Sequence, residues 1–295
     1  MLNLNLEYFR AFYYVSKLGN MSKAAEVLYL SQPAISRSIK KLEEYFGYEL
    51  FVRTSKGITL TYEGGLLFER ISLAFEHLFL AERELMESQE SIGGLINIAA
   101  TETPLYHLLI PKIESFKAIY PKATIHVSGS SSGETIRLLR EGLVSMTLAV
   151  TPVPLAADLD VVEMSSFHDI LVAGLGYSEL KNRVMPVKEL MEYPIITVEK
   201  GTSARVYVDL WFEEQGVILE PAYTVRTSTS VLPFVRHNLG IGILPSMFAE
   251  EPLEQNKVFQ VETEIPFPQR SIIIISLKNK PLSALCRNFL NHLRE

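Results

Sequence analysis

The chain has 295 residues and a formal net charge of −6; 47% of its residues are hydrophobic and 21% are charged. This length suits two domains. The composition indicates a globular protein with a substantial hydrophobic core and excludes a largely disordered chain. No apolar run approaches the ~18 residues of a membrane span. Glu7 and Arg10 interrupt the N-terminal apolar residues, so we expect no signal peptide. The single cysteine, Cys286, excludes an internal disulfide framework and favours the cytoplasm.

Charge is distributed unevenly along the chain. Residues 1–65 contain eight Lys or Arg and six Asp or Glu, a net of +2, whereas the remainder carries a net of −8. A positive N-terminal part in an otherwise acidic chain favours contact with a polyanion through that part alone.

The N-terminal part is predicted to begin with two helices. Apolar residues at helical spacing predict the first helix over 4–17, which ends at Gly19. A second helix is expected over 23–29 with Ser22 as its N-cap, and the small side chains of Ala24 and Ala25 would allow another helix to cross closely.

A third helix and a hairpin follow. Ser31 is expected to cap this helix, with Pro33 in the first turn, where a missing N–H costs little. Gly47 ends the helix. The stretch "ELFVRTSKGITLT" then predicts a strand, a turn at Gly57 and a second strand.

The polar face of the third helix suits DNA. Two short helices joined by a tight turn form a helix-turn-helix, whose second helix presents its N-terminal residues to the major groove. The Gln32 amide suits adenine, and the Arg37 guanidinium suits O6 and N7 of guanine. Phosphate or mixed contacts are expected from Ser36 and Lys40, while Arg53 and Lys56 of the hairpin are expected near the DNA backbone or the minor groove. The alternative is a solvated helix face in an all-α capping domain.

A long helix is predicted next, from Tyr62 to about Gln89, because apolar residues recur at helical spacing until Gly93-Gly94. An exposed helix of this length with an apolar stripe usually pairs with another helix. We interpret it as a linker and dimerisation element.

Strands alternate with helices beyond residue 94, which predicts a largely parallel sheet with covered faces. Strands are expected at 95–100, 124–129, 145–150, 194–198, 223–226, 240–245 and 271–277. Helices are expected at 105–119, 133–141, 204–215, 229–237 and 281–294. Residues 165–175 are interpreted as a crossover into a second lobe, from which 271–294 return to the first.

Hydroxyl-rich segments follow several of these strands and precede helices. In open α/β sheets, ligands bind where strands end and helix N-termini present free N–H groups. Such segments suit a small anion such as a carboxylate, although Ser and Thr are also ordinary N-caps. The candidate segments are 101–104, 128–132, 201–203 and 227–230.

A hydrolase is an alternative interpretation. Residues 129–133, "GSSSG", match G-x-S-x-G between a strand and a helix, with Ser131 as the nucleophile. The partners in that case would be Asp158, Asp160 or Asp169 and His237 or His292. No glycines suited to an oxyanion hole precede the motif. The six histidines lack metal-type spacing, so no metal and no cofactor is expected.

The N-terminal part resembles the winged helix-turn-helix of LysR-type transcriptional regulators. The resemblance lies in "NMSKAAEVLYLSQPAISRSIKKLEEYFGYELFVRTSKGITLTYEG", and the chain length, the long helix and "LGIGILP" (239–245) extend it over the whole chain. It implies a winged helix-turn-helix over 1–62, a linker helix over 63–92 and a two-lobed α/β effector domain, like that of periplasmic binding proteins, over 93–295. Lobe I would take about 93–165 and 267–295, and lobe II about 166–266.

The resemblance also implies contacts and partners: double-stranded DNA, a small-molecule effector between the lobes, and a homodimer or homotetramer without a membrane role. The DNA-contacting residues expected are Ser31, Gln32, Pro33, Ser36, Arg37, Lys40, Arg53 and Lys56. The effector-binding residues expected are Thr101, Glu102, Thr103, Ser130, Ser131, Thr202, Ser203, Thr227 and Ser228. A solute-binding protein, with the N-terminal domain only a dimerisation device, is the second class of interpretation.

Two residues depart from the expected pattern. The family usually has an acidic residue where this chain has Ser145, and Glu102 puts a carboxylate inside a presumed anion cleft. Both argue against a simple dicarboxylate or aromatic-acid effector and favour a ligand with a cationic group that pairs with Glu102.

Overall fold

The computed structural model describes residues 5–54, 57–87, 94–129 and 131–294. The chain forms two compact units, Met1–Met86 and Glu87–Glu295. No helix of the described residues combines the length and the apolar character that crossing a membrane requires.

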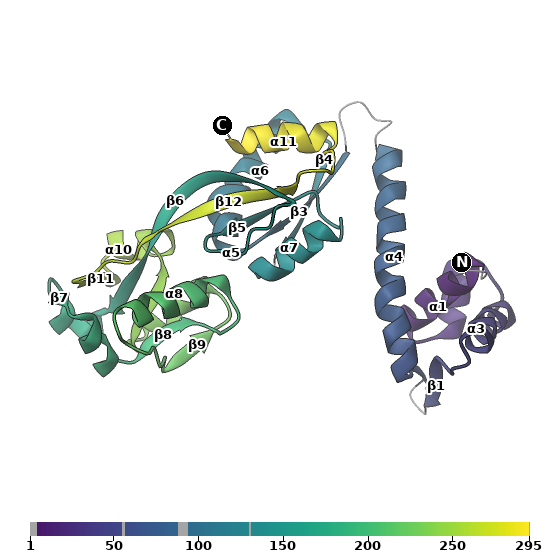
Figure 1. Cartoon of the computed structure of the whole chain (residues 1–295), viewed down its shortest axis with the longest axis horizontal. Helices are drawn as coiled ribbons and strands as arrows, with labels where there is room; N and C mark the ends of the chain where they lie inside the picture. The colour runs from purple at the N-terminus through teal and green to yellow at the C-terminus, as the bar shows by residue number, and fades with distance from the viewer. Residues whose placement is uncertain (1–4, 55–56, 88–93, 130, 295) are drawn as a thin grey trace. The chain divides into compact units, whose positions relative to one another are not determined.

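The first unit consists of helices and one small hairpin (Figure 1). The two strands pair antiparallel, with Phe51 opposite Leu60. The elements are α1 (Leu6–Leu18), α2 (Met21–Leu28), α3 (Gln32–Phe46), β1 (Phe51–Thr54), β2 (Gly57–Leu60) and α4 (Tyr62–Glu87). This is the winged helix-turn-helix that the sequence predicted.

The start of α2 differs from the prediction, in which Ser22 was the cap. Asn20 is the N-cap, and its side-chain oxygen accepts hydrogen bonds from the backbone N–H groups of Ser22 (2.8 Å) and Lys23 (3.0 Å). Asparagine caps helices at least as well as serine, so the helix begins two residues earlier.

The core of the first unit explains why the residues of the helix-turn-helix pattern are needed. Ala24 and Ala25 are buried where α2 packs against its neighbours, and Ile35 and Leu42 of α3 are buried opposite them. Gly64 is required for a different reason: a Cβ atom there would lie 2.1 Å from the carbonyl oxygen of Leu50. Any side chain at this position would push α4 away from the hairpin.

The apolar residues of helix α4 are partly packed within the first unit and partly exposed. Phe68 and Phe75 pack on Tyr13 of α1, with ring centroids 6.1 and 5.1 Å apart. Tyr62, Leu66, Leu78 and Phe79 are exposed on the first unit. The apolar stripe that predicted a pairing helix is therefore partly used within the unit and partly left open.

The second unit is a mixed α/β structure built on one continuous path of strands, in the order β4-β3-β5-β12-β6-β10-β8-β9. Its first part contains β3 (Gly94–Ala100), α5 (Glu102–Pro104), the π-helical turn η1 (Leu105–Leu109), α6 (Ile110–Ile119), β4 (Ala123–Gly129), α7 (Ser132–Arg140), β5 (Met146–Val150) and β6 (Leu159–Gly174). Its second part contains η2 (Leu175–Leu180), β7 (Val184–Met185), η3 (Val187–Glu192), β8 (Ile195–Val198), α8 (Ser203–Glu214), β9 (Tyr223–Val225), η4 (Ser228–Ser230), α9 (Val231–Arg236), β10 (Ile241–Pro245), η5 (Ser246–Phe248), α10 (Glu250–Glu254), β11 (Val258–Thr263), β12 (Gln269–Leu277) and α11 (Ala284–Arg294).

The prediction of a largely parallel sheet holds only at the two ends of this path. Strands β3, β4 and β5 pair parallel, as do β8, β9 and β10. Between them, β12 pairs antiparallel with β5 and β6, and β10 and β11 pair antiparallel with β6. The middle is antiparallel because β6 leaves one half of the unit and β12 returns to it.

Strands β6 and β12 join two lobes, which lie at their opposite ends (Figure 1). Strand β12 pairs with residues 159–168 of β6, and β10 pairs with residues 169–172. We call the half containing β3, β4 and β5 lobe I and the half containing β8, β9 and β10 lobe II. The predicted crossover near 165–175 is thus one long strand that belongs to both lobes.

Each lobe has its own core. In lobe I, Ile96, Phe116 and Phe289 pack together with Cys286, which is buried. In lobe II, the only tryptophan of the chain, Trp211, is 2% exposed and stacks on Phe267 with centroids 4.1 Å apart. The predicted helix at 105–119 begins instead as α5 and η1, and only 110–119 are regular α-helix.

Candidate DNA-binding surface and effector cleft

Helix α3 presents one face to the core of the first unit and the other to solvent. Ile35, Ile39 and Leu42 are buried at spacings of three and four residues. Of the predicted DNA-contacting residues here, Ser36 is half-buried and the exposed ones are Ser31, Gln32, Pro33, Arg37 and Lys40. The helical period that buries the apolar side chains therefore leaves the predicted polar face open.

The first turn of α3 keeps its polar groups available. Ser31 is the N-cap residue and its carbonyl accepts from the N–H of Ala34 (2.9 Å), but its side chain makes no capping hydrogen bond. The side chains of Gln32 and Arg37 make no hydrogen bond or ion pair with the described residues. Lys40 is 3.9 Å from Glu44, and both are well exposed, so this pair is weak.

The hairpin is attached to the end of α3 by a carboxylate. The Oε1 of Glu43 accepts a hydrogen bond from the backbone N–H of Leu50 (2.9 Å), just before β1 begins. Arg53 lies in β1 opposite Ile58. Lys56 lies outside the described residues.

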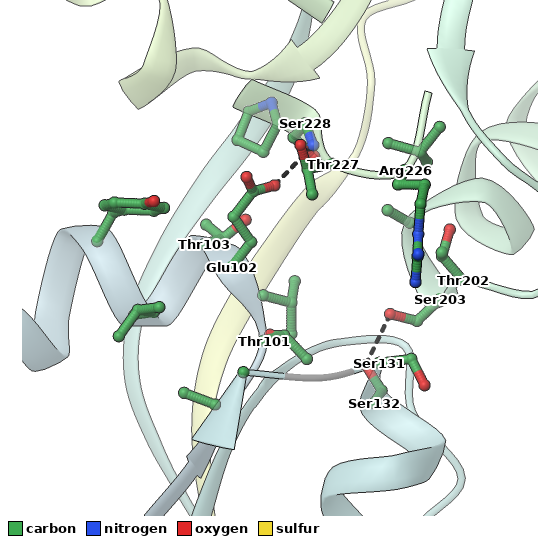
Figure 2. A pocket seen from close by; sticks show the side chains of 18 of the residues that line it. Thr101, Glu102, Thr103, Ser131, Ser132, Thr202, Ser203, Arg226, Thr227 and Ser228 are labelled. Atoms are coloured by element: carbon green, nitrogen blue, oxygen red, sulfur yellow. Dashed lines mark hydrogen bonds between the residues drawn. The ribbon is translucent and has the colours of Figure 1, made fainter. Parts of the chain in front are cut away.

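A cavity of about 690 Å³ lies between the two lobes, with walls from both. It brings together residues from all four hydroxyl-rich segments that the sequence singled out, which follow β3, β4, β8 and β9 (Figure 2). The predicted residues that line it are Thr101, Glu102, Thr103, Ser131, Thr202, Ser203, Thr227 and Ser228. Ser130, also predicted, lies outside the described residues.

Glu102 is bonded across this cleft. Its Oε2 accepts from the backbone N–H of Ser228 (2.6 Å; Figure 2) and its Oε1 accepts from the Thr229 hydroxyl (2.5 Å), so a lobe I carboxylate is held by lobe II donors. Nearby, the His107 ring of η1 lies edge-on to Phe248 of lobe II, with centroids 4.8 Å apart.

The opposite side of the cleft carries a second bond between the lobes. The hydroxyls of Ser132 at the start of α7 and Ser203 at the start of α8 are 2.9 Å apart (Figure 2). Thr202 caps α8 by accepting from the N–H of Arg205 (3.1 Å). In contrast, the buried Oγ1 of Thr101 has no hydrogen-bond partner among the described residues.

Two arginines of the cleft were not predicted. Arg226 extends toward Ser203 in Figure 2, and its Nε lies 3.5 Å from a carboxylate oxygen of Glu199. Arg270, at the start of β12, is only 3% exposed and also lines the cavity. The sequence offered a signal for Arg226, which precedes the Thr227 segment, but none for Arg270, which begins an ordinary apolar strand.

Arg270 is a buried cation that connects both lobes. Its Nη1 donates to Asp169 (2.7 Å), its Nε donates to the Thr151 carbonyl (2.8 Å), and its guanidinium lies 4.5 Å from the Tyr207 ring centroid. No described residue accepts from its Nη2. Burial raises the pKa of the Asp169 carboxyl above its ordinary value, although the Arg270 charge opposes this shift.

Another carboxylate of the cavity wall is held within lobe I. Glu134 bonds to Arg137 on the same helix, with the closest oxygen 2.6 Å from Nη2. This hydrogen bond lowers the pKa of Glu134 below its ordinary value. Glu134 thus matches Glu102 in charge but makes no bond across the cleft.

Three of the candidate partners in the hydrolase alternative have other partners in the structure. The Nε2 of His292 lies 2.7 Å from the hydroxyl of Ser115. Asp158 pairs with Arg140, and Asp169 pairs with Arg270. The described part of the chain contains no hydrogen bond between Ser131 and a histidine. It also contains no group of three or more His, Cys, Asp and Glu residues placed to hold a metal ion.

Comparison with known families identifies both units. Residues 6–65 match the bacterial regulatory helix-turn-helix proteins of the lysR family, and residues 89–295 match the LysR substrate binding domain. The chain therefore belongs to the LysR family. It is a DNA-binding transcriptional regulator with an effector-binding domain.

Curated relatives resemble the chain over most of its length. The HTH-type transcriptional regulator SsuR of Burkholderia cenocepacia is 26% identical over 284 residues, covering 94% of this chain and 91% of that protein. The HTH-type transcriptional regulator CysB of Haemophilus influenzae is 28% identical over 231 residues, covering 77% of this chain and 71% of that protein.

Solved structures share the fold. Full-length CbnR complexed with its target DNA matches with a TM-score of 0.77 at 20% identity, covering 99% of both chains. CbnR, described as a LysR family transcriptional regulator, also matches in a second structure with a TM-score of 0.73 at 20% identity, covering 99% of this chain and 98% of that one.

Proposed function

We propose that this regulator reads its operator through the exposed face of α3 and responds to a small molecule bound between lobes I and II. The observation that carries the first part is the open polar face of α3, where Arg37 has no partner in the described chain. Gln32 and Arg37 contact base edges, and the surrounding residues make the remaining contacts with the DNA, to phosphates where they have a donor. This second group comprises Ser31, Pro33, Ser36, Lys40, Arg53 and Lys56.

The effector site is the interlobe cavity. Thr101, Ser131 and Thr202 place hydroxyls around it, and Arg226 supplies a cation at its edge. Thr103, Ser203, Thr227 and Ser228 complete the hydroxyl wall, and Ser130 belongs to the same segment as Ser131. A ligand that touches both lobes favours one arrangement of the two lobes over others. Such coupling is worth about 1–3 kcal/mol.

The chain acts as a homodimer or homotetramer, with α4 as the pairing element. The support is the exposure of apolar side chains on this helix, among them Leu66 and Leu78 at 52% and 48%. We therefore divide the chain into a DNA-binding domain over 1–62, a linker helix over 63–92 and an effector domain over 93–295. The protein works in the cytoplasm, where its DNA is, and it is a regulator without catalytic activity of its own.

A competition experiment tests this proposal. DNA fragments from the region upstream of the gene that encodes this chain are footprinted with the protein. The binding of the protected duplex is then titrated by fluorescence anisotropy in the presence of bulk competitor DNA. We expect protection of a pseudo-palindromic site, with an affinity at least ~10³-fold above that for bulk DNA. Equal affinity for all duplexes would contradict the proposal and favour the solute-binding interpretation.

A metabolite panel screened by thermal shift then identifies the effector. A ligand at ~100 times its dissociation constant adds about 2.7 kcal/mol to the stability of the folded state. An esterase assay of the native chain and Ser131→Ala tests the hydrolase alternative: we expect no activity in either.

A further inference from the structure

The carboxylate of Glu102 occupies a position inside the proposed effector cleft that needs a physical explanation. It comes from lobe I, yet both of its oxygens accept hydrogen bonds from lobe II, one from the Ser228 N–H and one from the Thr229 hydroxyl. A carboxylate is an acceptor only, so these bonds are directional and charge-assisted. The Ser228 and Thr229 donors therefore form a carboxylate-binding pair, and the chain supplies the carboxylate that fills it.

This contact differs from the other carboxylate contacts around the cavity. Glu134 is bonded to Arg137 on its own helix, and Glu199 lies beside Arg226 within lobe II. Only Glu102, of these three acids, connects the two lobes. The Ser132–Ser203 hydroxyl pair on the opposite side of the cleft is a second bridge, but a neutral one.

We propose that Glu102 is an internal substitute for an acidic effector group: it fills the Ser228 and Thr229 donors from within the chain, holds the lobes together, and excludes effectors with an acid group at this end. This inference rests on the proposed effector cleft. An acid group placed beside Glu102 would meet a like charge and find its donors already taken.

The effector of this chain therefore presents a neutral or cationic group to Glu102. Its acidic group, if it has one, lies toward Arg226, where the guanidinium, Thr202 and Ser203 supply donors. Glu102 is in this sense a specificity-determining residue. This role explains why an acidic side chain is present in a cleft that is rich in hydrogen-bond donors.

Acetate rescue provides a direct test. The substitution Glu102→Ala removes one methylene group and the carboxylate, which together have the size and chemistry of acetate. If the Ser228 and Thr229 donors bind carboxylates, sodium acetate restores the missing contact in this variant. Trp211 in the core of lobe II reports unfolding of the full-length protein without any DNA or effector.

The measured quantity is the midpoint temperature of thermal unfolding, followed by tryptophan fluorescence. We expect 0.2 M sodium acetate, compared with sodium chloride at equal ionic strength, to raise this midpoint in Glu102→Ala by about 2–4 °C. The wild type and Glu134→Ala, which loses the same charge from the same cavity, should show no such difference. An equal acetate effect in all three proteins, or none in Glu102→Ala, would overturn the proposal.

A second variant keeps the test decisive if Glu102→Ala folds poorly. Thr229→Val removes one donor and leaves the Glu102 carboxylate in place. We expect a lower midpoint than in the wild type and no rescue by acetate, because the internal carboxylate still occupies the position. A midpoint equal to that of the wild type would mean that the hydrogen bond between Thr229 and Glu102 does not stabilise the two lobes, and it would refute the proposal. None of these outcomes depends on DNA binding, so failure here is distinguishable from failure of the proposed function.

Discussion

Replacement of Arg37 tests how the exposed face of α3 reads DNA. The side chain of Arg37 makes no hydrogen bond or ion pair with the described residues, and Ile35, Ile39 and Leu42 hold the helix from the opposite face. Arg37→Ala therefore leaves the first unit folded, and its whole effect appears in DNA binding. A bidentate arginine–guanine contact discriminates by about 1–3 kcal/mol, or ~5- to 150-fold at 25 °C.

Arg37→Lys is the matched control, because it retains the charge but loses the planar two-donor geometry. The assay is anisotropy titration of the footprinted operator and of duplexes with single base-pair changes, each over a series of salt concentrations. For a base contact, we expect both variants to lose preference at one position of each half-site. The slope of log affinity against log salt should change little in Arg37→Lys.

A different result would refute this reasoning. If Arg37→Ala weakened binding to all duplexes equally and reduced the salt slope by about 0.9, while Arg37→Lys behaved as the wild type, Arg37 would contact a phosphate. The base-reading role would then fall to Gln32 or to another residue of the exposed face.

Three further predictions concern stability. Gly64→Ala should destabilise the first unit by about 1–3 kcal/mol, because the added Cβ would lie 2.1 Å from the Leu50 carbonyl oxygen. The assay is urea unfolding followed by circular dichroism. Gly65→Ala is the control and should be tolerated, because a Cβ added there has no neighbouring atom within 4 Å. Asn20→Ala should cost about 1 kcal/mol in the same assay, whereas an equal loss in Ser22→Ala would contradict the assignment of Asn20 as the cap of α2. Burial lowers the pKa of His107 despite the opposing charge of Glu250. The unfolded state thus binds more protons just below pH 6.5, so the free energy of unfolding of the second unit should decrease as the pH falls through that value. The decrease should be smaller in His107→Gln, and an unchanged pH dependence in this variant would refute the assignment.

The local elements of the first unit were largely predictable because their signals are short-range. Apolar spacing, Pro33 in a first turn and glycines after helix ends indicated α1, α3 and the hairpin directly. The error at α2 arose because Asn20 and Ser22 are both good N-caps, and local sequence does not choose between them. The long α4 was likewise predicted, but not which of its apolar residues pack on α1 and which stay exposed.

The two-part organisation, the helix-turn-helix and the hydroxyl-rich segments of the cleft could all be predicted from the sequence. These depend on periodicity and on residue types at the ends of elements, which neighbours in the chain largely control. Only the tertiary structure decided that β6 and β12 run antiparallel between the lobes, that Arg270 is buried in the cavity wall, and that Glu102 is bonded to Ser228 and Thr229. Glu102 and Ser228 are 126 positions apart, and no local preference specifies which distant donors a carboxylate meets when the lobes pack.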